Sequence, residues 1–374
     1  MRPILRGGLC FAVVLLLALL LAGCDRAPVN LGFLGGLTGP ASDLGTGGRD
    51  GALLAVEQIN QHGGLLGASI KLHEFDDQQQ PGTLPVVLEA VKKAGVLALV
   101  GPMTSSVAKA WIPLADQARL LTISPTVTSS DFTGHDDYFF RVISDTRSYA
   151  RASATHYTER QHWSRFAVVF DETNAAYTRS WLQHFQQAMQ ERGVALVSAT
   201  GFGLPQSPSL AFLAQQTLML HPDALVLIAN ATDSAQMAQL VRKKNLQLPI
   251  IATEWSATAQ LLLLGGAAVE GMRIAQFMDH QSQEPGYLKF VADFQTRFGR
   301  APGFAEVAAY DAMRVLLEAL AQQRPDESIK ASLLRIRQFK GLQQSVVFDD
   351  FGDSSRQVVM TEVKGGRYQV LGGP

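Results

Sequence analysis

Short apolar runs alternate with amphipathic stretches along most of this chain. In the first part, four apolar runs predict strands: residues 29–34, 70–75, 96–100 and 120–123. Between the first two, apolar residues recur at helical spacing: Ala52, Leu53, Val56 and Ile59. Gly63 and Gly64 then end that helix. Strands that alternate with helices are typical of a parallel sheet covered by helices.

The same pattern begins again after Arg141. Four further runs predict strands at residues 166–170, 194–198, 224–229 and 249–252, with helical patterns at 177–192, 210–220 and 234–245 between them. Two long helices, 285–298 and 305–322, precede three short runs at 346–348, 358–363 and 368–371. We therefore predict an α/β protein with two doubly wound lobes. In such sheets ligands bind beyond the carboxyl ends of the strands, so the residues that follow strands are the candidates for a site.

The N-terminus has the pattern of a secretory signal. Arg2 and Arg6 precede an apolar run over residues 9–22, which is shorter than the roughly 20 residues needed to cross a bilayer. The run ends in Leu21-Ala22-Gly23-Cys24, which resembles a bacterial lipobox and implies removal of residues 1–23 and lipidation of Cys24. A signal cut elsewhere, with Cys24 incidental, is the alternative. The expected location is outside the cytoplasmic membrane, lipid-anchored, either periplasmic or on the cell surface.

Composition limits the classes of partner that the protein is expected to bind, and its cysteine content indicates whether disulfides form. The 374 residues are 47% apolar and 17% charged, which suits two globular domains, and the net charge of -1 argues against a nucleic-acid partner. Of the two cysteines, Cys10 leaves with the signal and Cys24 carries lipid. The mature domain then has no cysteine and forms no disulfide.

Motifs of catalysis and cofactor binding are missing from the sequence. It contains no G-x-S-x-G, H-E-x-x-H, phosphate-loop or C-x-x-C motif. Residues 45–50 come nearest to a dinucleotide fingerprint, but Asp50 replaces the third glycine. The 8 histidines are scattered without metal-ligand spacing. We expect no enzyme activity, no cofactor and no metal.

Several short segments occur in the order of one known family. They are Leu37-Thr38-Gly39-Pro40, Ala55-Val56-Glu57-Gln58-Ile59-Asn60, Phe75-Asp76-Asp77-Gln78, Val100-Gly101-Pro102, Ile123-Ser124-Pro125, Phe140-Arg141, Ala309-Tyr310-Asp311-Ala312 and Val347-Phe348-Asp349. Together they resemble the branched-chain amino-acid binding proteins, the type I periplasmic receptors that feed ABC transporters. The resemblance implies two lobes joined by three hinge crossings, which we place near Ser144, Gln276 and Gly341. It assigns residues 29–143 plus 277–340 to the N-terminal lobe and 144–276 plus 341–374 to the C-terminal lobe.

The resemblance also implies which residues of the first lobe bind the ligand. Ser105, Thr126 and Thr128 fall where the family holds the α-carboxylate and the ammonium of an amino acid. Free N–H groups and hydroxyls at helix starts suit a carboxylate, and a carbonyl such as that of Thr126 suits an ammonium. Simple helix capping by Ser105 and Thr128 is the alternative. Asp145 falls near an acid that faces the ammonium, and a helix N-cap is an equally good interpretation of it.

From the second lobe, Tyr177 matches a tyrosine that covers the ligand, and Glu254 a carboxylate that pairs with its ammonium. The alternatives are an aromatic packed on its own helix and an exposed loop glutamate. A buried charge needs a partner, so a cleft glutamate implies a cationic group in the ligand. Leu44 and Asn230 depart from the aromatic residues common in the family, and Trp255 adds bulk beside Glu254. Leucine itself is therefore not assumed as the ligand.

These observations predict a solute-binding lipoprotein of an ABC-type uptake system that closes two lobes on an amino acid or an amino-acid-like ligand. Its expected partners are that small molecule, the membrane permease subunits and the membrane through the lipid. Two alternatives stay open: a receptor domain that reports the ligand to a membrane partner, and a binder of a carboxylate or amide that is not an amino acid.

Overall fold

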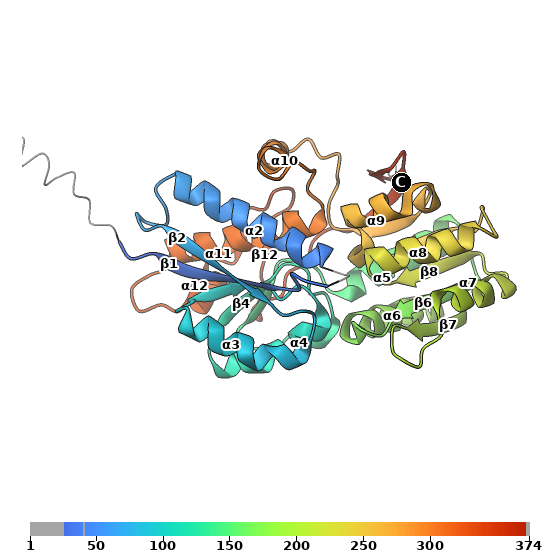
Figure 1. Ribbon diagram of the computed structural model, residues 1–374, viewed down its shortest axis with the longest axis horizontal. Coiled ribbons are helices and arrows are strands. Elements are labelled where there is room, and N and C mark those ends of the chain that lie inside the picture. Colours follow the sequence, from blue (N-terminus) through green and yellow to red (C-terminus); the bar gives the residue numbers. More distant parts are fainter. Residues whose placement is uncertain (1–25, 40–41, 372–374) are drawn as a thin grey trace, which may run out of the picture.

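The chain forms two lobes that lie side by side along the long axis of the molecule (Figure 1). This computed structural model describes residues 26–39 and 42–371. The predicted signal segment and the lipidation site Cys24 lie outside the described residues. Within those ranges, no helix combines the length and apolar character needed to cross a membrane.

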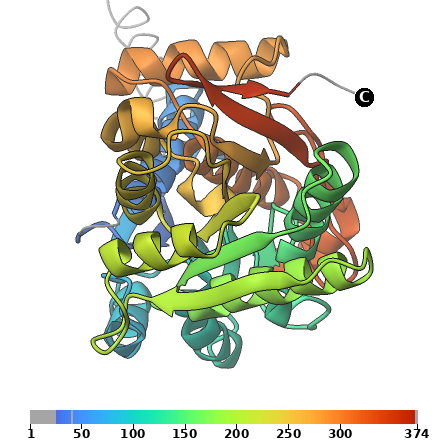
Figure 2. The ribbon, with the colours of Figure 1, turned by 90° about the vertical axis from the view of Figure 1, so that its right-hand side faces the viewer.

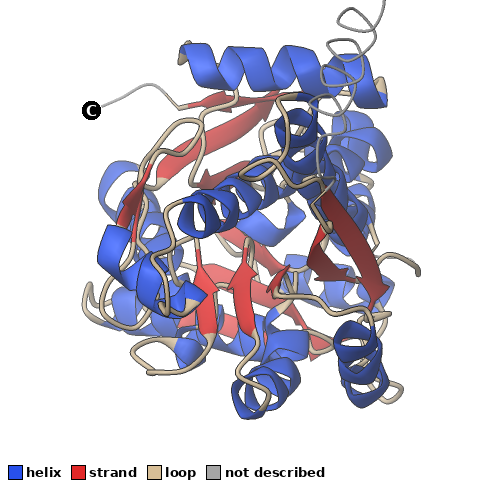
Figure 3. Ribbon diagram, turned by 90° about the vertical axis from the view of Figure 1, so that its left-hand side faces the viewer, coloured by secondary structure: helices blue, strands red, loops and turns tan. Residues whose placement is uncertain are grey.

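The first lobe is built on a five-stranded parallel sheet in the order β2-β1-β3-β4-β5. Its strands are β1 (Val29–Gly35), β2 (Ile70–Asp76), β3 (Ala98–Val100), β4 (Leu121–Ser124) and β5 (Phe139–Arg141). Its helices are α2 (Asp43–Gln61), α3 (Leu84–Lys93), α4 (Ser105–Gln117), α10 (Pro285–Phe298), α11 (Phe304–Ala321) and α12 (Ile329–Ile336). Figure 3 shows helices on both sides of these strands. Successive side chains of a strand face opposite ways, so Phe33 packs in the core on one face and Leu34 in the core on the other.

The second lobe contains a seven-stranded sheet in the order β14-β13-β10-β9-β8-β6-β7, seen face-on in Figure 2. Five strands are parallel: β6 (Phe166–Asp171), β7 (Leu196–Phe202), β8 (Ala224–Ile228), β9 (Ile250–Ala252) and β10 (Arg273–Gln276). Antiparallel strands β13 (Val359–Lys364) and β14 (Arg367–Val370) extend one edge. The helices are α5 (Thr146–Thr155), α6 (Ala175–Gln190), α7 (Leu210–Met219), α8 (Ala231–Arg242) and α9 (Ala259–Gly265).

Both lobes order their parallel strands in the same way. Counted along the chain within each lobe, the spatial order is 2-1-3-4-5, with the first and third strands adjacent at the centre. This order has a switch point where the connections turn to opposite faces, and crevices at the carboxyl ends of the strands form there. The predicted α/β class with two doubly wound lobes is confirmed.

The chain passes between the sheets three times, after β5, after β10 and before β13. The short hairpin of β11 (Gln338–Phe339) and β12 (Val346–Val347) precedes the third passage. The segment after this hairpin still packs on the first lobe: the Phe348 and Phe140 rings meet edge to face at 5.2 Å, and the Arg141 N–H donates to the Gly352 carbonyl at 3.0 Å. The third passage therefore follows Ser354 and does not lie near Gly341, where the sequence placed it.

A buried ion pair joins these passages. Arg356 lies on the third one, and its guanidinium is 2.9 Å from the Asp311 carboxylate of α11, with both side chains 1% exposed. Ser144, on the first passage, donates through Oγ to the Arg356 carbonyl and accepts from the Arg356 N–H. Phe277, on the second, has its ring 5.0 Å below the same guanidinium. Through its main chain and its guanidinium, Arg356 thus connects all three crossings to the first lobe.

Helix α2 approaches its neighbours closely because glycines line its N-terminal half. A Cβ atom at Gly45 would lie 2.1 Å from the Gly36 carbonyl oxygen, and one at Gly51 would lie 2.2 Å from the Glu306 carbonyl oxygen of α11. Backbone atoms cannot yield as a flexible side chain can, so this approach requires glycine. The close packing sets the position of Leu44, which is in the first turn of α2.

We predict that Gly51→Ala destabilises the protein by about 2 kcal/mol or more, because the added methyl forces α2 away from α11. Gly286→Ala in α10 is the matched control. A Cβ there meets no atom within 4 Å, so that variant keeps or slightly raises stability. Denaturant unfolding of both variants checks this, and equal stabilities would contradict the packing argument.

Candidate ligand-binding site

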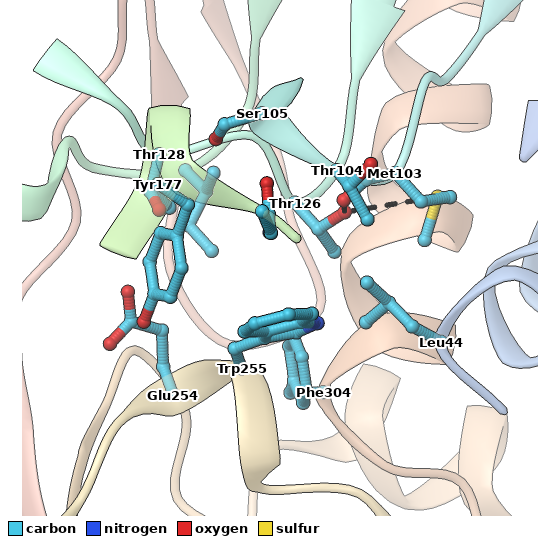
Figure 4. A pocket seen from close by; sticks show the side chains of 12 residues that line it. Leu44, Met103, Thr104, Ser105, Thr126, Thr128, Tyr177, Glu254, Trp255 and Phe304 are labelled. Atoms are coloured by element: carbon cyan, nitrogen blue, oxygen red, sulfur yellow. Dashed lines mark hydrogen bonds between the residues drawn. The ribbon is translucent and has the colours of Figure 1, made fainter. Parts of the chain in front are cut away.

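A small cavity lies between the two lobes (Figure 4). It is lined by Leu44, Met103, Thr104, Ser105, Thr126, Thr128, Ile143, Asn174, Tyr177, Glu254, Trp255 and Phe304. Most of these residues follow the carboxyl end of a strand: β1, β3, β4 and β5 in the first lobe, and β6 and β9 in the second. The cavity volume of about 10 Å³ has room for roughly one water molecule. The lobes are therefore closed on each other.

The first lobe contributes three of the predicted site residues to this cavity. Ser105 begins α4, and its Oγ accepts from the Ser129 N–H at 3.3 Å, which leaves the hydroxyl proton available. The Thr126 hydroxyl donates to the Met103 carbonyl at 2.6 Å. The Thr128 Oγ1 is buried and has no hydrogen-bond partner among the described residues. Ser105 and Thr128 are the hydroxyls that remain free to bind a ligand.

Glu254 is the only carboxylate that lines this cavity. It lies in a short 3-10 turn (Glu254–Ser256) after β9 and is 4% exposed. Neither carboxylate oxygen has a hydrogen-bond or ion-pair partner anywhere in the described part of the chain. Burial raises the pKa of this carboxyl from 4.5 to about 7, although nearby donors on Tyr177, Trp181 and Thr128 act in the opposite direction.

Tyr177 lies in the first turn of α6, and its hydroxyl points toward the Glu254 carboxyl in Figure 4. Its ring packs edge to face against Trp255 at 5.6 Å. Burial and the adjacent Glu254 raise the pKa of this phenol well above its usual value, so the hydroxyl stays protonated. Tyr177 therefore closes one end of the cavity as a neutral hydrogen-bonding group.

The opposite end of the cavity is apolar. Leu44, Met103 and Phe304 come from the first lobe, and Trp255 comes from the second. Figure 4 shows Trp255 between the Glu254 end and Leu44. A ligand with one polar end and one apolar end matches this division.

Asp145 does not reach the cavity. Its side chain accepts from the Ser148 N–H at 3.3 Å and caps α5, which is the alternative that the sequence left open. It borders a separate surface cleft of about 460 Å³, together with Arg141 and Asp353. Asn230 is likewise absent from the cavity wall and caps α8, where its Oδ1 accepts from the Asp233 N–H.

Several residues of the site were missed by the sequence analysis. Asn174 and Thr104 are N-cap residues of α6 and α4, so their position before a helix was the available signal. Phe304 lies far along the chain and has no local signal. Trp181 and Tyr149 surround Glu254 from α6 and α5 without lining the cavity, and each has a buried polar atom with no partner among the described residues.

Hydrogen bonds between the lobes lie near the cavity. The Ser106 N–H of α4 donates to the Asn174 side chain at 3.0 Å, and Ser106 Oγ accepts from the Ala176 N–H at 3.3 Å. The Thr258 hydroxyl donates to the Asp43 carboxylate of α2 at 2.6 Å. Because their partners belong to different lobes, these contacts exist only while the lobes are together.

The described residues contain no cluster of three or more histidine, cysteine, aspartate or glutamate side chains that could hold a metal ion. The chemistry of the cavity is that of hydroxyls, one carboxylate and aromatic rings. This set suits reversible binding of a small molecule.

We predict that Glu254→Gln stabilises the ligand-free protein at pH 8. The folded state binds the Glu254 proton more tightly than the unfolded state, so the wild type loses about 3 kcal/mol of unfolding free energy as pH rises from 4.5 to about 7. Glutamine at this position removes the loss at pH 8. At pH 4.5 the wild type has not yet lost this stability, so the variant has no advantage over it there.

Thermal unfolding at the two pH values measures the effect. Glu306→Gln is the matched control, because Glu306 is buried but accepts from the Arg300 guanidinium and the Gly303 N–H. That variant loses a charge-assisted contact and is destabilised at pH 8. A Glu254→Gln variant that is no more stable than the wild type at pH 8 would contradict the prediction.

Comparison with known proteins identifies the family and the fold. A family model described as periplasmic binding protein matches residues 28–367. The chain is 23% identical over 330 residues, 87% of each chain, to the leucine-, isoleucine-, valine-, threonine- and alanine-binding protein of Pseudomonas aeruginosa.

Two solved structures share the fold. The branched-chain amino-acid transporter substrate-binding protein LivJ of Streptococcus pneumoniae, in complex with isoleucine, superposes with a TM-score of 0.83 at 20% identity and covers 92% of this chain and 99% of its own. A solute-binding protein from R. palustris, in complex with benzoate, has a TM-score of 0.83 at 18% identity and covers 92% and 96%. The chain belongs to the periplasmic binding protein family, as a type I member of the branched-chain amino-acid receptor group.

Proposed function

We propose that this protein is the extracytoplasmic solute-binding lipoprotein of an ABC-type uptake system and captures an amino acid or an amino-acid-like ligand by closing its two lobes. The observation that supports this most directly is Glu254, a buried carboxylate at the cavity with no partner of its own. Such a group needs a positive charge to compensate its burial. An α-ammonium is the cation that an amino acid supplies.

In this proposal the first lobe binds the α-carboxylate. Ser105 stands in the first turn of α4, where backbone N–H groups lack intrahelical acceptors and the helix dipole favours an anion. The Ser105 hydroxyl and the first-turn N–H groups other than that of Ser106, which donates to the Asn174 side chain, form the carboxylate site. The Thr128 hydroxyl and the Thr126 carbonyl then lie beside the ammonium, and Glu254 and Tyr177 complete its surroundings from the second lobe.

Capture proceeds by closure in this scheme. The closed cavity is too small for an amino acid to enter, so uptake begins from an open form in which Ser105 and Thr128 are accessible. Contacts with Glu254 and Tyr177 become available only when the lobes meet, and they shift the population toward the closed form. A permease that recognises the closed shape then accepts only loaded protein. The lipid on Cys24 holds the protein close to that permease.

A carboxylate that is not an amino acid is the second candidate ligand. It is favoured by the benzoate complex of the R. palustris protein and by the two aromatic rings, Trp255 and Phe304, on the apolar side of this cavity. Such a ligand lacks the ammonium, so it leaves Glu254 without a cation. The dependence of binding on Glu254 separates the two candidates.

We predict that Glu254→Ala and Ser105→Ala each weaken the binding of L-leucine or L-isoleucine at least tenfold, which corresponds to a loss of about 1.4 kcal/mol or more. Isothermal titration calorimetry measures both. Benzoate serves as the control, because Ser105→Ala weakens an anion of either kind, whereas Glu254→Ala weakens only a cationic ligand. Unchanged amino-acid affinity in both variants would show that the site is misassigned.

We predict that Thr258→Val weakens the same binding about fivefold, through faster dissociation. The substitution keeps the side-chain shape but removes the hydroxyl that donates to Asp43 across the lobes, a contact worth about 1 kcal/mol. Neither residue lines the cavity. Stopped-flow fluorescence measures the rate, and Thr258→Ser, which retains the hydroxyl, dissociates like the wild type. Equal rates for all three proteins would mean that this contact does not hold the lobes together.

A further inference from the structure

Trp181 has a buried polar group that the binding scheme does not use. The side chain is 1% exposed, and its indole Nε1 donates to no acceptor with hydrogen-bond geometry in the described ranges. Leaving such a donor unsatisfied costs free energy, so its position needs an explanation. The indole N–H is a donor only, which means that it cannot accept from a ligand ammonium. Trp181 is also absent from the cavity wall.

The packing of α6 sets the direction of this indole. Tyr177, Trp181 and Phe185 are spaced four residues apart and share one face of the helix. The Trp181 ring stacks on Phe185 at 5.0 Å with 27° between the planes, and Phe185 packs edge to face on Phe166 of β6. Phe185 therefore contacts the Trp181 ring on the side that is farther along α6 from Tyr177.

The face of α6 that carries Tyr177 and Trp181 packs beside the Glu254 carboxyl, which is a hydrogen-bond acceptor. Tyr177 directs its hydroxyl to the Glu254 carboxyl in Figure 4. Trp181 lies one turn further along the same helix, and its indole N–H is among the donors beside that carboxyl. Both oxygens of Glu254 are buried without a completed hydrogen bond to any described residue. Two donors on one helix face thus converge on one carboxyl group. Donors at binding sites often reach ideal geometry only when the ligand is in place.

We infer that Trp181 is a positioning residue for Glu254. Its indole N–H donates to the ionised Glu254 carboxylate from the side that the ligand does not occupy, and this hydrogen bond keeps the carboxylate directed at the cavity. The inference rests on the proposed function, in which the ionised form of Glu254 binds the ammonium. The inference gives Trp181 a role that acts through Glu254, since Trp181 does not line the cavity that holds the ligand.

The other groups around this carboxyl are neutral. Tyr177 comes from α6, Thr128 from the first lobe and Tyr149 from α5. The Arg356 charge lowers the pKa of Tyr149 and the Asp145 charge raises it. No described arginine or lysine forms an ion pair with Glu254. A hydrogen bond to the ionised form opposes the effect of burial, so removing the indole N–H raises the pKa of Glu254 further.

Trp181→Phe tests this, because phenylalanine keeps an aromatic ring on Phe185 and removes the N–H. We expect the affinity of the wild type for L-leucine to increase with pH up to a midpoint near 7, where Glu254 ionises, and to fall about tenfold per pH unit below that midpoint. We expect Trp181→Phe to move the midpoint up by about one pH unit, with affinity largely restored above it. Trp111→Phe is the matched control, since its buried indole donates to Thr122 within the first lobe.

A second measurement does not depend on any ligand. Carboxyl carbon NMR of ligand-free protein labelled at glutamate follows the Glu254 titration directly, with Glu254→Gln identifying the resonance. An upward shift of the Glu254 titration in Trp181→Phe, and none in Trp111→Phe, supports the positioning role of Trp181. This result stands even if L-leucine does not bind the wild type, and failure to bind would count against the proposed function instead. An unchanged Glu254 titration, or an affinity loss that is equal at every pH, overturns the role of Trp181.

Discussion

The structure of this site depends on one unfavourable burial. Glu254 takes its carboxylate out of water beside Tyr177 and Trp255, and no arginine or lysine of the described residues pairs with it. The desolvation cost of such a group exceeds what neutral donors return, which is why its pKa rises to about 7. A protein that only needed stability would replace this residue by an amide. The carboxylate lies at the point where the two lobes meet, and in the proposed function the ammonium of the ligand compensates its burial there.

The contacts around this site differ between the hinge and the cleft. Arg356 of the third crossing forms a buried ion pair with Asp311 of the first lobe, and Ser144 and Phe277 contact the same arginine from the other two crossings. The three crossings therefore share one anchor. Across the cleft, by contrast, the lobes meet through single hydrogen bonds such as that between Thr258 and Asp43. Strong contacts at the hinge and weak ones around the cavity suit a clamp whose equilibrium a small molecule can shift.

Glycines in α2 serve the same site from a distance. Gly45 and Gly51 lower the helix propensity of α2, but they allow its backbone to approach Gly36 and α11 closely. This approach brings Leu44 to the apolar end of the cavity, where Trp255 and Phe304 also lie. The resulting cavity is polar on the side of Glu254 and apolar on the side of Leu44.

The sequence by itself determined the alternation of strands and helices, the two lobes and the loops that carry the site. Buried strands such as 166–170 and 224–229 were predictable because apolar runs bounded by polar turns reflect burial on both faces. The resemblance to the branched-chain amino-acid binding proteins, and not the pattern alone, supplied Ser105, Thr128, Tyr177 and Glu254, which line the cavity. The short strands β5 and β10 were not among the predicted runs, because each has only two apolar residues, next to Arg141 in β5 and between Arg273 and Gln276 in β10. Only the tertiary structure decided that Asp145 caps a helix, that the third crossing follows Ser354, and that Phe304 and Trp181 belong with Glu254. These outcomes depend on contacts between residues far apart in the chain, and the local pattern of a segment contains no information about which distant side chain will pack against it.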